Sequence, residues 1–139
     1  LADRRRSDDA VGILMADIDH FKRINDRHGH DTGDLVLRAV AGAIASAVRD
    51  GDVPARFGGE EFVVLLRRPS DRIAVEIAER VRSAVGALEL GAIGPGRISV
   101  SVGVAVQDAA DEPVADLLAR ADRALYRAKR AGRDRVEAA

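Results

Sequence analysis

The sequence contains no cysteine and no tryptophan, and it has only three phenylalanines and one tyrosine. The absence of cysteine excludes disulfide bonds and thiolate metal sites, so a reducing, cytoplasmic environment is the natural expectation. Because aromatic residues are scarce, the core must be built from valine, isoleucine, leucine and alanine. No apolar run approaches the roughly 20 residues that a membrane-spanning helix needs, so we expect no membrane segment in this chain.

An excess of charge of one sign is missing too. The 22 Lys and Arg residues are balanced by 23 Asp and Glu residues, which gives a formal net charge of -1. Domains that bind DNA or RNA usually carry a strong positive excess, so no nucleic-acid partner is expected. The length of 139 residues fits one hydrophobic core. We therefore expect a single domain over residues 1–139, cut from a longer protein that could itself be attached to a membrane.

The first third of the chain predicts one strand and two helices. Residues 11–16 form a continuous apolar run, which is typical of a buried strand. A polar stretch over residues 19–27 is compatible with a helix. Apolar residues at helical spacing then predict a second helix that extends to about Arg49, with Asp31 or Thr32 as its N-cap.

The middle of the chain predicts a β-hairpin. Residues 53–57 and 62–66 are short apolar runs, and Gly58-Gly59-Glu60-Glu61 joins them. Paired glycines between such runs favour a tight turn, because the preferred turns need positive φ angles.

The remaining elements follow from similar patterns. Ser70 is expected to cap a helix whose apolar stripe extends to Leu88. Valines alternate with small residues over 98–106, the period of a strand. A last helix is expected over 114–131, with Gly132 as its stop signal.

The resulting order is β-α-α-β-β-α-β-α, with a short strand expected near Val136. A hairpin within this order implies a mixed central sheet flanked by helices, of the α/β (α+β) class and close to the split βαβ arrangement.

Three carboxylates are expected at one edge of that sheet. Asp17 follows the first predicted strand, and Glu60 and Glu61 lie in the hairpin turn. Clustered acids repel one another unless a cation or proton shares the site. Oxygen ligands with open water positions suit Mg²⁺, which can stabilise the charge of a phosphoryl group during its transfer. From these residues alone, solvated turn acids remain an equally good interpretation.

Four segments of the sequence resemble the signature motifs of the diguanylate cyclase (GGDEF) family. They are residues 17–34 (DIDHFKRIND, then GHD and GD), 56–62 (RFGGEEF), 101–105 (SVGVA) and 121–129 (ADRALYRAK). The second segment, RFGGEEF, carries glutamate at the third position of GGDEF, the motif that gives the family its name. The resemblance covers residues 11–136, and it implies a nucleotidyl-cyclase or palm-like fold that condenses two GTP into cyclic dimeric GMP. Mg²⁺ is the implied cofactor, with Mn²⁺ as an alternative.

The resemblance also implies a set of active-site residues. Asp17, the Ile18 carbonyl and Glu60 would hold the metal ion, with Glu61 close to it. Glu60 and Glu61 are the catalytic candidates, and Glu60 would assist deprotonation of the attacking 3′-hydroxyl. The implied GTP contacts are His20, Phe21, Lys22, Lys129 and Arg133 for phosphate, Asn25 and Asp34 for guanine, and Gly58 and Gly59 for close approach of the nucleotide. Lys129 and Arg133 also suit a helix C-terminus for electrostatic reasons alone.

Arg49 and Asp52 form an Arg-x-x-Asp pair shortly before the Gly-Gly turn, and the family uses this spacing for an inhibitory product site. Arg80 matches the arginine that completes it. An ordinary helix-end arginine and turn aspartate are the alternative interpretation. One chain carries residues for one GTP, so a homodimer is expected for activity. Two other functions remain open, a non-catalytic receptor for GTP or cyclic dimeric GMP and a simple interaction domain.

Overall fold

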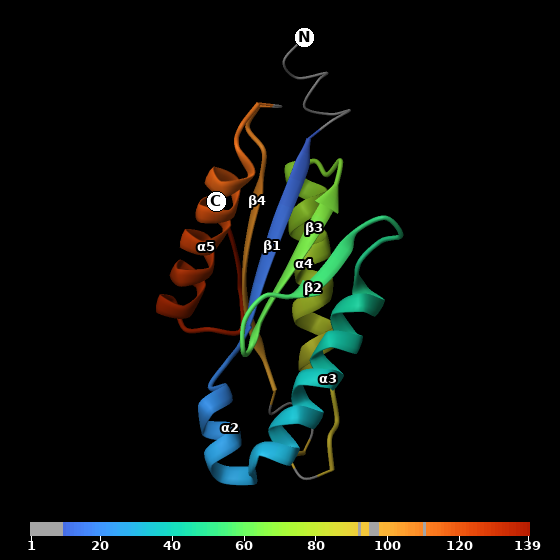
Figure 1. Ribbon diagram of the computed structural model, residues 1–139, viewed down its shortest axis with the longest axis vertical. Coiled ribbons are helices and arrows are strands. Elements are labelled where there is room, and N and C mark those ends of the chain that lie inside the picture. The colour runs from blue at the N-terminus through green and yellow to red at the C-terminus, as the bar shows by residue number, and fades with distance from the viewer. Residues whose placement is uncertain (1–9, 92, 95–97, 110) are drawn as a thin grey trace.

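The computed structural model describes residues 10–91, 93–94, 98–109 and 111–139. Within these ranges, four helices and five strands follow one another along the chain (Figure 1). They are β1 (Val11–Ile18), α2 (Phe21–His28), α3 (His30–Ala47), β2 (Val53–Arg56), β3 (Glu61–Arg67), α4 (Asp71–Gly86), β4 (Val100–Val106), α5 (Val114–Arg130) and β5 (Val136–Ala138).

The strands form one mixed sheet in the order β2-β3-β1-β4-β5. β1 lies in the middle and is antiparallel to both neighbours, whereas β4 and β5 are parallel. The predicted mixed sheet with flanking helices is therefore confirmed. Figure 1 shows α5 on one side of the sheet and α4 on the other. In this view α2 lies below the sheet, and α3 lies at the lower right, next to β2.

β1 is buried on both faces of the sheet, which explains its unbroken apolar sequence. Its Leu14 and Ile18 belong to the larger core, between the sheet and the α3–α4 layer. Its Ile13 and Met15 belong to a second cluster against α5. The strand is longer than predicted and includes Asp17, so this acid lies within β1 and not after it.

β4 is also completely buried, although its large and small residues alternate. The small residues face α5 and let that helix approach the sheet closely. A Cβ atom added at Gly103 would overlap the backbone of α5 at Ala121 O and Leu125 N. The alternation therefore reflects a close helix–sheet contact on one face of the strand.

Two predicted helix ends are confirmed. The Ser70 hydroxyl accepts a hydrogen bond from the Ile73 N–H at 3.1 Å and caps α4. Gly132 follows the C-terminus of α5 with a φ of 127°, and the N–H of Arg133 donates to the Ala128 carbonyl. This is the hydrogen bond of a Schellman-type helix end.

Two other predictions about the backbone were wrong. Neither Asp31 nor Thr32 caps the second helix, because α3 begins at His30 and Gly29 at its N-cap supplies no side chain. Gly58 and Gly59 do not adopt positive φ angles. The hairpin closes through a wider loop, over residues 57–60, which needs no left-handed residue. In the described part of the chain, no helix is long and apolar enough to cross a membrane.

Candidate active site

The backbone of β1 and β3 brings the predicted acids to one edge of the sheet. Asp17 lies directly opposite Glu61 in the antiparallel register. The N–H of Ile18 donates to the Glu60 carbonyl at 3.3 Å. Because register neighbours share a face of the sheet, Asp17 and Glu61 project to the same side. Asp17 is only 6% exposed, so this edge holds a largely desolvated carboxylate.

A lysine from α5 balances part of this negative charge. The Lys129 ammonium lies 2.5 Å from Asp17 Oδ2. Burial raises the pKa of Glu60 above its ordinary value, the charge of Asp17 raises it further, Lys129 opposes this rise, and Glu61 adds to it. The edge is therefore short of positive charge even with the lysine in place.

The donors at this edge suit a divalent cation. In the described part of the chain, no three carboxylate or imidazole side chains are grouped closely enough to bind a metal ion by themselves. Asp17, Glu60 and the backbone carbonyl of Ile18 offer a smaller set of hard oxygen ligands. Mg²⁺ typically takes one or two carboxylates and completes its coordination with water and phosphate oxygens. The residues present fit Mg²⁺ in this substrate-dependent mode.

The loop over residues 57–60 is held by an arginine that the sequence did not single out. Arg56 donates to the carbonyls of Gly58 at 3.2 Å and Gly59 at 2.7 Å. The Glu61 side chain lies over Gly58, where an added Cβ would come within 2.9 Å of Glu61 Oε1. A side chain at position 58 would therefore make the flexible Glu61 side chain move, and Gly58 itself has no positive φ.

Next to Glu60 lies a pocket of about 560 Å³. Its lining residues come from α2, α3, β2 and the hairpin loop: Phe21, Lys22, Asn25, His30, Asp34, Leu37, Arg56, Gly59 and Glu60. Asn25 Oδ1 is buried there without a hydrogen-bond partner in the described residues. The Asn25 side chain lies on Gly33, since any Cβ at Gly33 would overlap it. A buried acceptor is costly to leave unpaired, but this oxygen is packed against Gly33 and is not exposed to the pocket.

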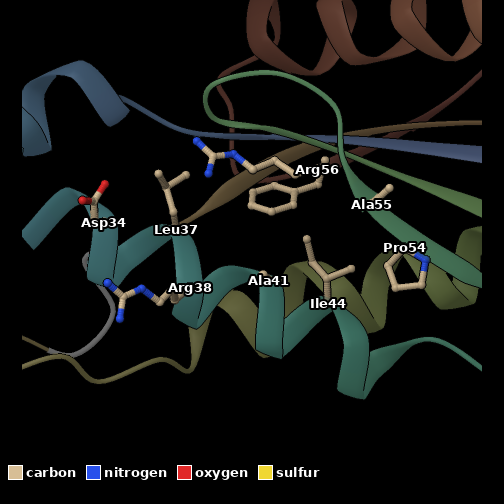
Figure 2. A pocket seen from close by; sticks show the side chains of 9 residues that line it. Asp34, Leu37, Arg38, Ala41, Ile44, Pro54, Ala55 and Arg56 are labelled. Atoms are coloured by element: carbon tan, nitrogen blue, oxygen red, sulfur yellow. The ribbon is translucent and has the colours of Figure 1, made fainter.

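A second pocket, of about 450 Å³, adjoins the first and shares Asp34, Leu37 and Arg56 with it. Figure 2 shows this pocket between α3 and β2, with Ala41 and Ile44 on its floor and Pro54 on the opposite wall. Its lining is mostly aliphatic, which contrasts with the polar pocket beside Glu60. Asp34 therefore stands at the border between a polar and an apolar cavity. It lies in the second turn of α3, and not in the first as the predicted cap implied.

The residues expected to bind phosphate lie at two helix ends. His20 is the N-cap of α2 in a left-handed conformation, with a φ of 55° and no side-chain cap. The amides that follow it, including those of Phe21 and Lys22, begin the helix, a position that favours anions. The second helix end is the C-terminus of α5. Arg133 lies just after it, is exposed, and also has a positive φ, of 65°.

Comparison with known proteins shows the family of this chain. The family model described as "Diguanylate cyclase, GGDEF domain" matches residues 1–135. The chain belongs to the diguanylate cyclase (GGDEF) family. It is 48% identical to diguanylate cyclase DgcP of Pseudomonas aeruginosa over 97% of this chain and 20% of that protein. It is 43% identical to diguanylate cyclase A of Treponema denticola over 92% of this chain and 35% of that protein. The chain thus spans about a third or less of these relatives.

Solved structures of GGDEF domains have the same fold. The active GGEEF domain of a diguanylate cyclase from Vibrio cholerae superimposes with a TM-score of 0.88 at 36% identity, over 99% of this chain and 86% of that chain. The GGDEF domain of DgcB from Caulobacter crescentus, solved in complex with c-di-GMP, has a TM-score of 0.84 at 38% identity, over 93% of this chain and 77% of that chain.

The Arg-x-x-Asp pair of this GGDEF domain forms a tight structural unit. Arg49 donates from Nε and Nη2 to both carboxylate oxygens of Asp52, each at 3.0 Å. Backbone N–H groups of Arg49 and Arg67 also donate to Asp52, and Arg49 Nη2 donates to the Arg67 carbonyl at 2.7 Å. The Asp52 side chain has no exposed surface. From α4, exposed Arg80 reaches the same corner and donates to the Ala47 carbonyl at 3.0 Å.

This arrangement predicts acid sensitivity centred on Asp52. Burial by itself would raise the pKa of Asp52, but the hydrogen bonds from Arg49 and Arg67 outweigh it and leave the pKa below its ordinary value. The stabilisation is therefore complete above the pKa of the unfolded state and is lost as the pH falls through the folded-state pKa. We expect Asp52→Asn to lower the free energy of unfolding by about 2 kcal/mol at pH 7.

The pH dependence separates this effect from simple loss of packing. Urea unfolding of both proteins between pH 7 and pH 3 should show the difference shrinking toward the acid end. A difference that stays constant over this range would mean that the Asp52 charge does not stabilise the fold.

Proposed function

We propose that this GGDEF domain condenses two GTP molecules into cyclic dimeric GMP and releases two pyrophosphates. The observation that carries the proposal is the pocket beside Glu60. It combines a carboxylate at the edge of the sheet, a lysine at the start of α2 and two groups, Asn25 and Asp34, that suit a nucleobase. Phosphate chemistry and base recognition would therefore take place in one cavity.

Guanine fits the base-recognition end of the pocket. Its N1–H and exocyclic amine are donors, which match the Asp34 carboxylate, and Asn25 lines the same pocket. Adenine presents an acceptor at N1 and would meet Asp34 lone pair to lone pair. The triphosphate would extend toward the amides of His20 and Phe21 and the Lys22 side chain, with Lys129 and Arg133 approaching from α5. Gly58 and Gly59 leave room for the nucleotide beside the hairpin loop.

The reaction that follows from this placement is a displacement at phosphorus. The 3′-hydroxyl oxygen of one GTP forms a bond to the α-phosphorus of the other, the bond between that phosphorus and the bridging oxygen breaks, and pyrophosphate leaves. Glu60 would accept the hydroxyl proton, and Glu61 follows it directly in the chain. Bound at Asp17, the Ile18 carbonyl and Glu60, with Glu61 close, Mg²⁺ or Mn²⁺ would supply charge neutralisation and make the hydroxyl more acidic. A second, equivalent step closes the ring.

Because the product is two-fold symmetric and one chain has residues for one GTP, the active form is proposed to be a homodimer. The GTP bound to each subunit would present its 3′-hydroxyl to the α-phosphorus of the GTP bound to the other subunit. Specific activity should therefore rise with protein concentration.

Incubation with GTP and Mg²⁺, followed by chromatography of the nucleotides, tests the proposal. Cyclic dimeric GMP and two equivalents of pyrophosphate are expected, with no product from ATP. GTP binding without any turnover, across a concentration series that reaches a dimer, would favour the receptor function instead.

Base selectivity should depend on Asp34. Asp34→Asn converts one acceptor into a donor and removes a charge, so GTP binding should weaken by about 1.5–3 kcal/mol. Calorimetry with GTP checks this, with exposed Asp31→Asn at the start of the same helix as the matched control. Equal GTP affinity of the Asp34 variant and the unmodified protein would remove Asp34 from base recognition.

Product inhibition is proposed at Arg49, Asp52 and Arg80, where an arginine can pair with guanine O6 and N7. Arg80 is a better residue to substitute than Arg49, because Arg49 also stabilises the buried Asp52 and its loss would affect the fold. Arg80→Ala should leave the initial rate unchanged and weaken inhibition by about tenfold, since a charged contact is lost. Progress curves with added cyclic dimeric GMP measure this. Identical inhibition in both proteins would mean that Arg80 has only a structural role.

A further inference from the structure

Asp19 has no part in the chemistry described above, yet it is one of the best-connected side chains near the site. It is 8% exposed. Its Oδ1 accepts a hydrogen bond from the Ser101 hydroxyl at 2.6 Å. Its Oδ2 accepts from the Ser99 hydroxyl at 2.7 Å and from the Asp134 N–H at 3.1 Å. One carboxylate thus connects the end of β1 to β4 and to the loop after α5.

The two segments that Asp19 connects are those proposed to hold the triphosphate. On one side, Asp19 directly precedes His20, the left-handed N-cap whose amide begins α2. Its own N–H donates to the Ser99 carbonyl at 2.9 Å, which fixes the backbone at this point. On the other side, Asp134 directly follows Arg133, so the bond to its N–H fixes the peptide that carries this arginine.

The loop after α5 needs such a restraint. Arg133 and Asp134 both have positive φ angles, 65° and 46°, a conformation that residues other than glycine adopt rarely. The N–H of Arg133 donates back to α5, whereas the N–H of Asp134 is held by Asp19. Without this acceptor the N–H of the second left-handed residue would lose its partner, and the loop would relax.

We propose that Asp19 is a positioning residue for the triphosphate of GTP. Its carboxylate holds the start of α2 and the Arg133 loop at a fixed separation, so that amides and a guanidinium face the same phosphates. A carboxylate is suited to this role because three donors converge on it and it has no donor of its own. This inference rests on the proposed function and adds a determinant of substrate affinity to it.

The test separates phosphate binding from base binding. Calorimetry in Mg²⁺ with 3′-deoxy-GTP, which cannot react, reports on the whole nucleotide, whereas GMP reports mainly on the base. Asp19→Ala should weaken 3′-deoxy-GTP binding by about tenfold, since charge-assisted hydrogen bonds are lost. GMP affinity should change by less than about twofold. In turnover assays the KM for GTP should rise more than kcat falls.

Two further variants make the result decisive. Asp19→Asn fills the same volume but offers one acceptor oxygen in place of two, so about a threefold loss in 3′-deoxy-GTP affinity is expected. It also provides the measurement if the alanine variant does not fold. Arg82→Ala is the matched control. Arg82 Nη1 bonds the side chain of Asp134, at Oδ1 and 3.2 Å, whereas Asp19 bonds the backbone N–H of the same residue. It should leave both affinities unchanged.

Several outcomes would overturn the inference. Unchanged 3′-deoxy-GTP affinity in the Asp19 variants, with the unmodified protein active, would reject the role of Asp19 and leave the proposed function standing. Equal losses for 3′-deoxy-GTP and GMP, or an equal loss in Arg82→Ala, would indicate a general structural role. An unmodified protein that binds no GTP at all would overturn the proposed function, and the inference with it.

Discussion

Glu60→Gln should reduce synthesis of cyclic dimeric GMP by roughly 10³-fold, because the variant loses both a proton acceptor and the negative charge of an oxygen ligand for Mg²⁺. The substitution keeps the size and shape of the side chain. High-performance chromatography of the nucleotides after incubation with GTP measures the effect. Exposed Glu89→Gln, outside the pocket residues, is the matched control and should retain full activity.

The same variant should not lose stability, and this separates a chemical role from a structural one. The pKa of Glu60 is raised by burial and by Asp17. A raised carboxyl pKa means that the ionised form is disfavoured in the folded state, so ionisation at neutral pH opposes folding. A neutral glutamine removes this opposition, and the melting temperature at pH 7 should be equal or higher. An inactive variant with a clearly lower melting temperature would instead indicate that Glu60 supports the fold.

Predictions from local patterns succeeded where one segment contains all the information needed. The hydroxyl of Ser70 and the N–H it accepts from are three residues apart, and the β2–β3 hairpin pairs neighbouring runs. The final helix was predicted for a similar reason, since Leu117, Ala121 and Leu125 recur at helical spacing and are buried together. In each case the contacts that stabilise the element lie close in sequence.

Predictions failed or were missing where distant segments decide the outcome. Asp19 looks like one more acid in a charged motif, and its partners are 80 or more residues away. Ser99, just before β4, and Ser101, within it, were the signal that a buried polar group needed partners there. The pairing of Asp17 with Lys129, 112 residues apart, is another such contact. The hairpin loop closes without a left-handed glycine, and its carbonyls bond the Arg56 side chain, a contact that local turn preferences do not describe.

The contact between α5 and the sheet is the structural feature on which the site depends most, because α5 brings Lys129 to Asp17. Gly103 permits this contact, and an added Cβ there would overlap backbone atoms of α5, which cannot move aside as a flexible side chain can. Gly103→Ala should therefore lower the free energy of unfolding by about 3 kcal/mol, the upper part of the range for overpacked cores. It should also displace α5 and separate Lys129 from Asp17.

Gly42→Ala is the matched control for this substitution. Gly42 lies within α3, is exposed, and has no atom within 4 Å of an added Cβ. Alanine there should raise the free energy of unfolding by about 0.5–1 kcal/mol, because glycine loses more chain entropy in a helix. Urea unfolding of both variants gives opposite signs for the same chemical change if the α5 contact is as close as described. A Gly103→Ala protein as stable and as active as the unmodified domain would mean that α5 can withdraw from β4 without consequence, and that the position of Lys129 does not depend on this contact.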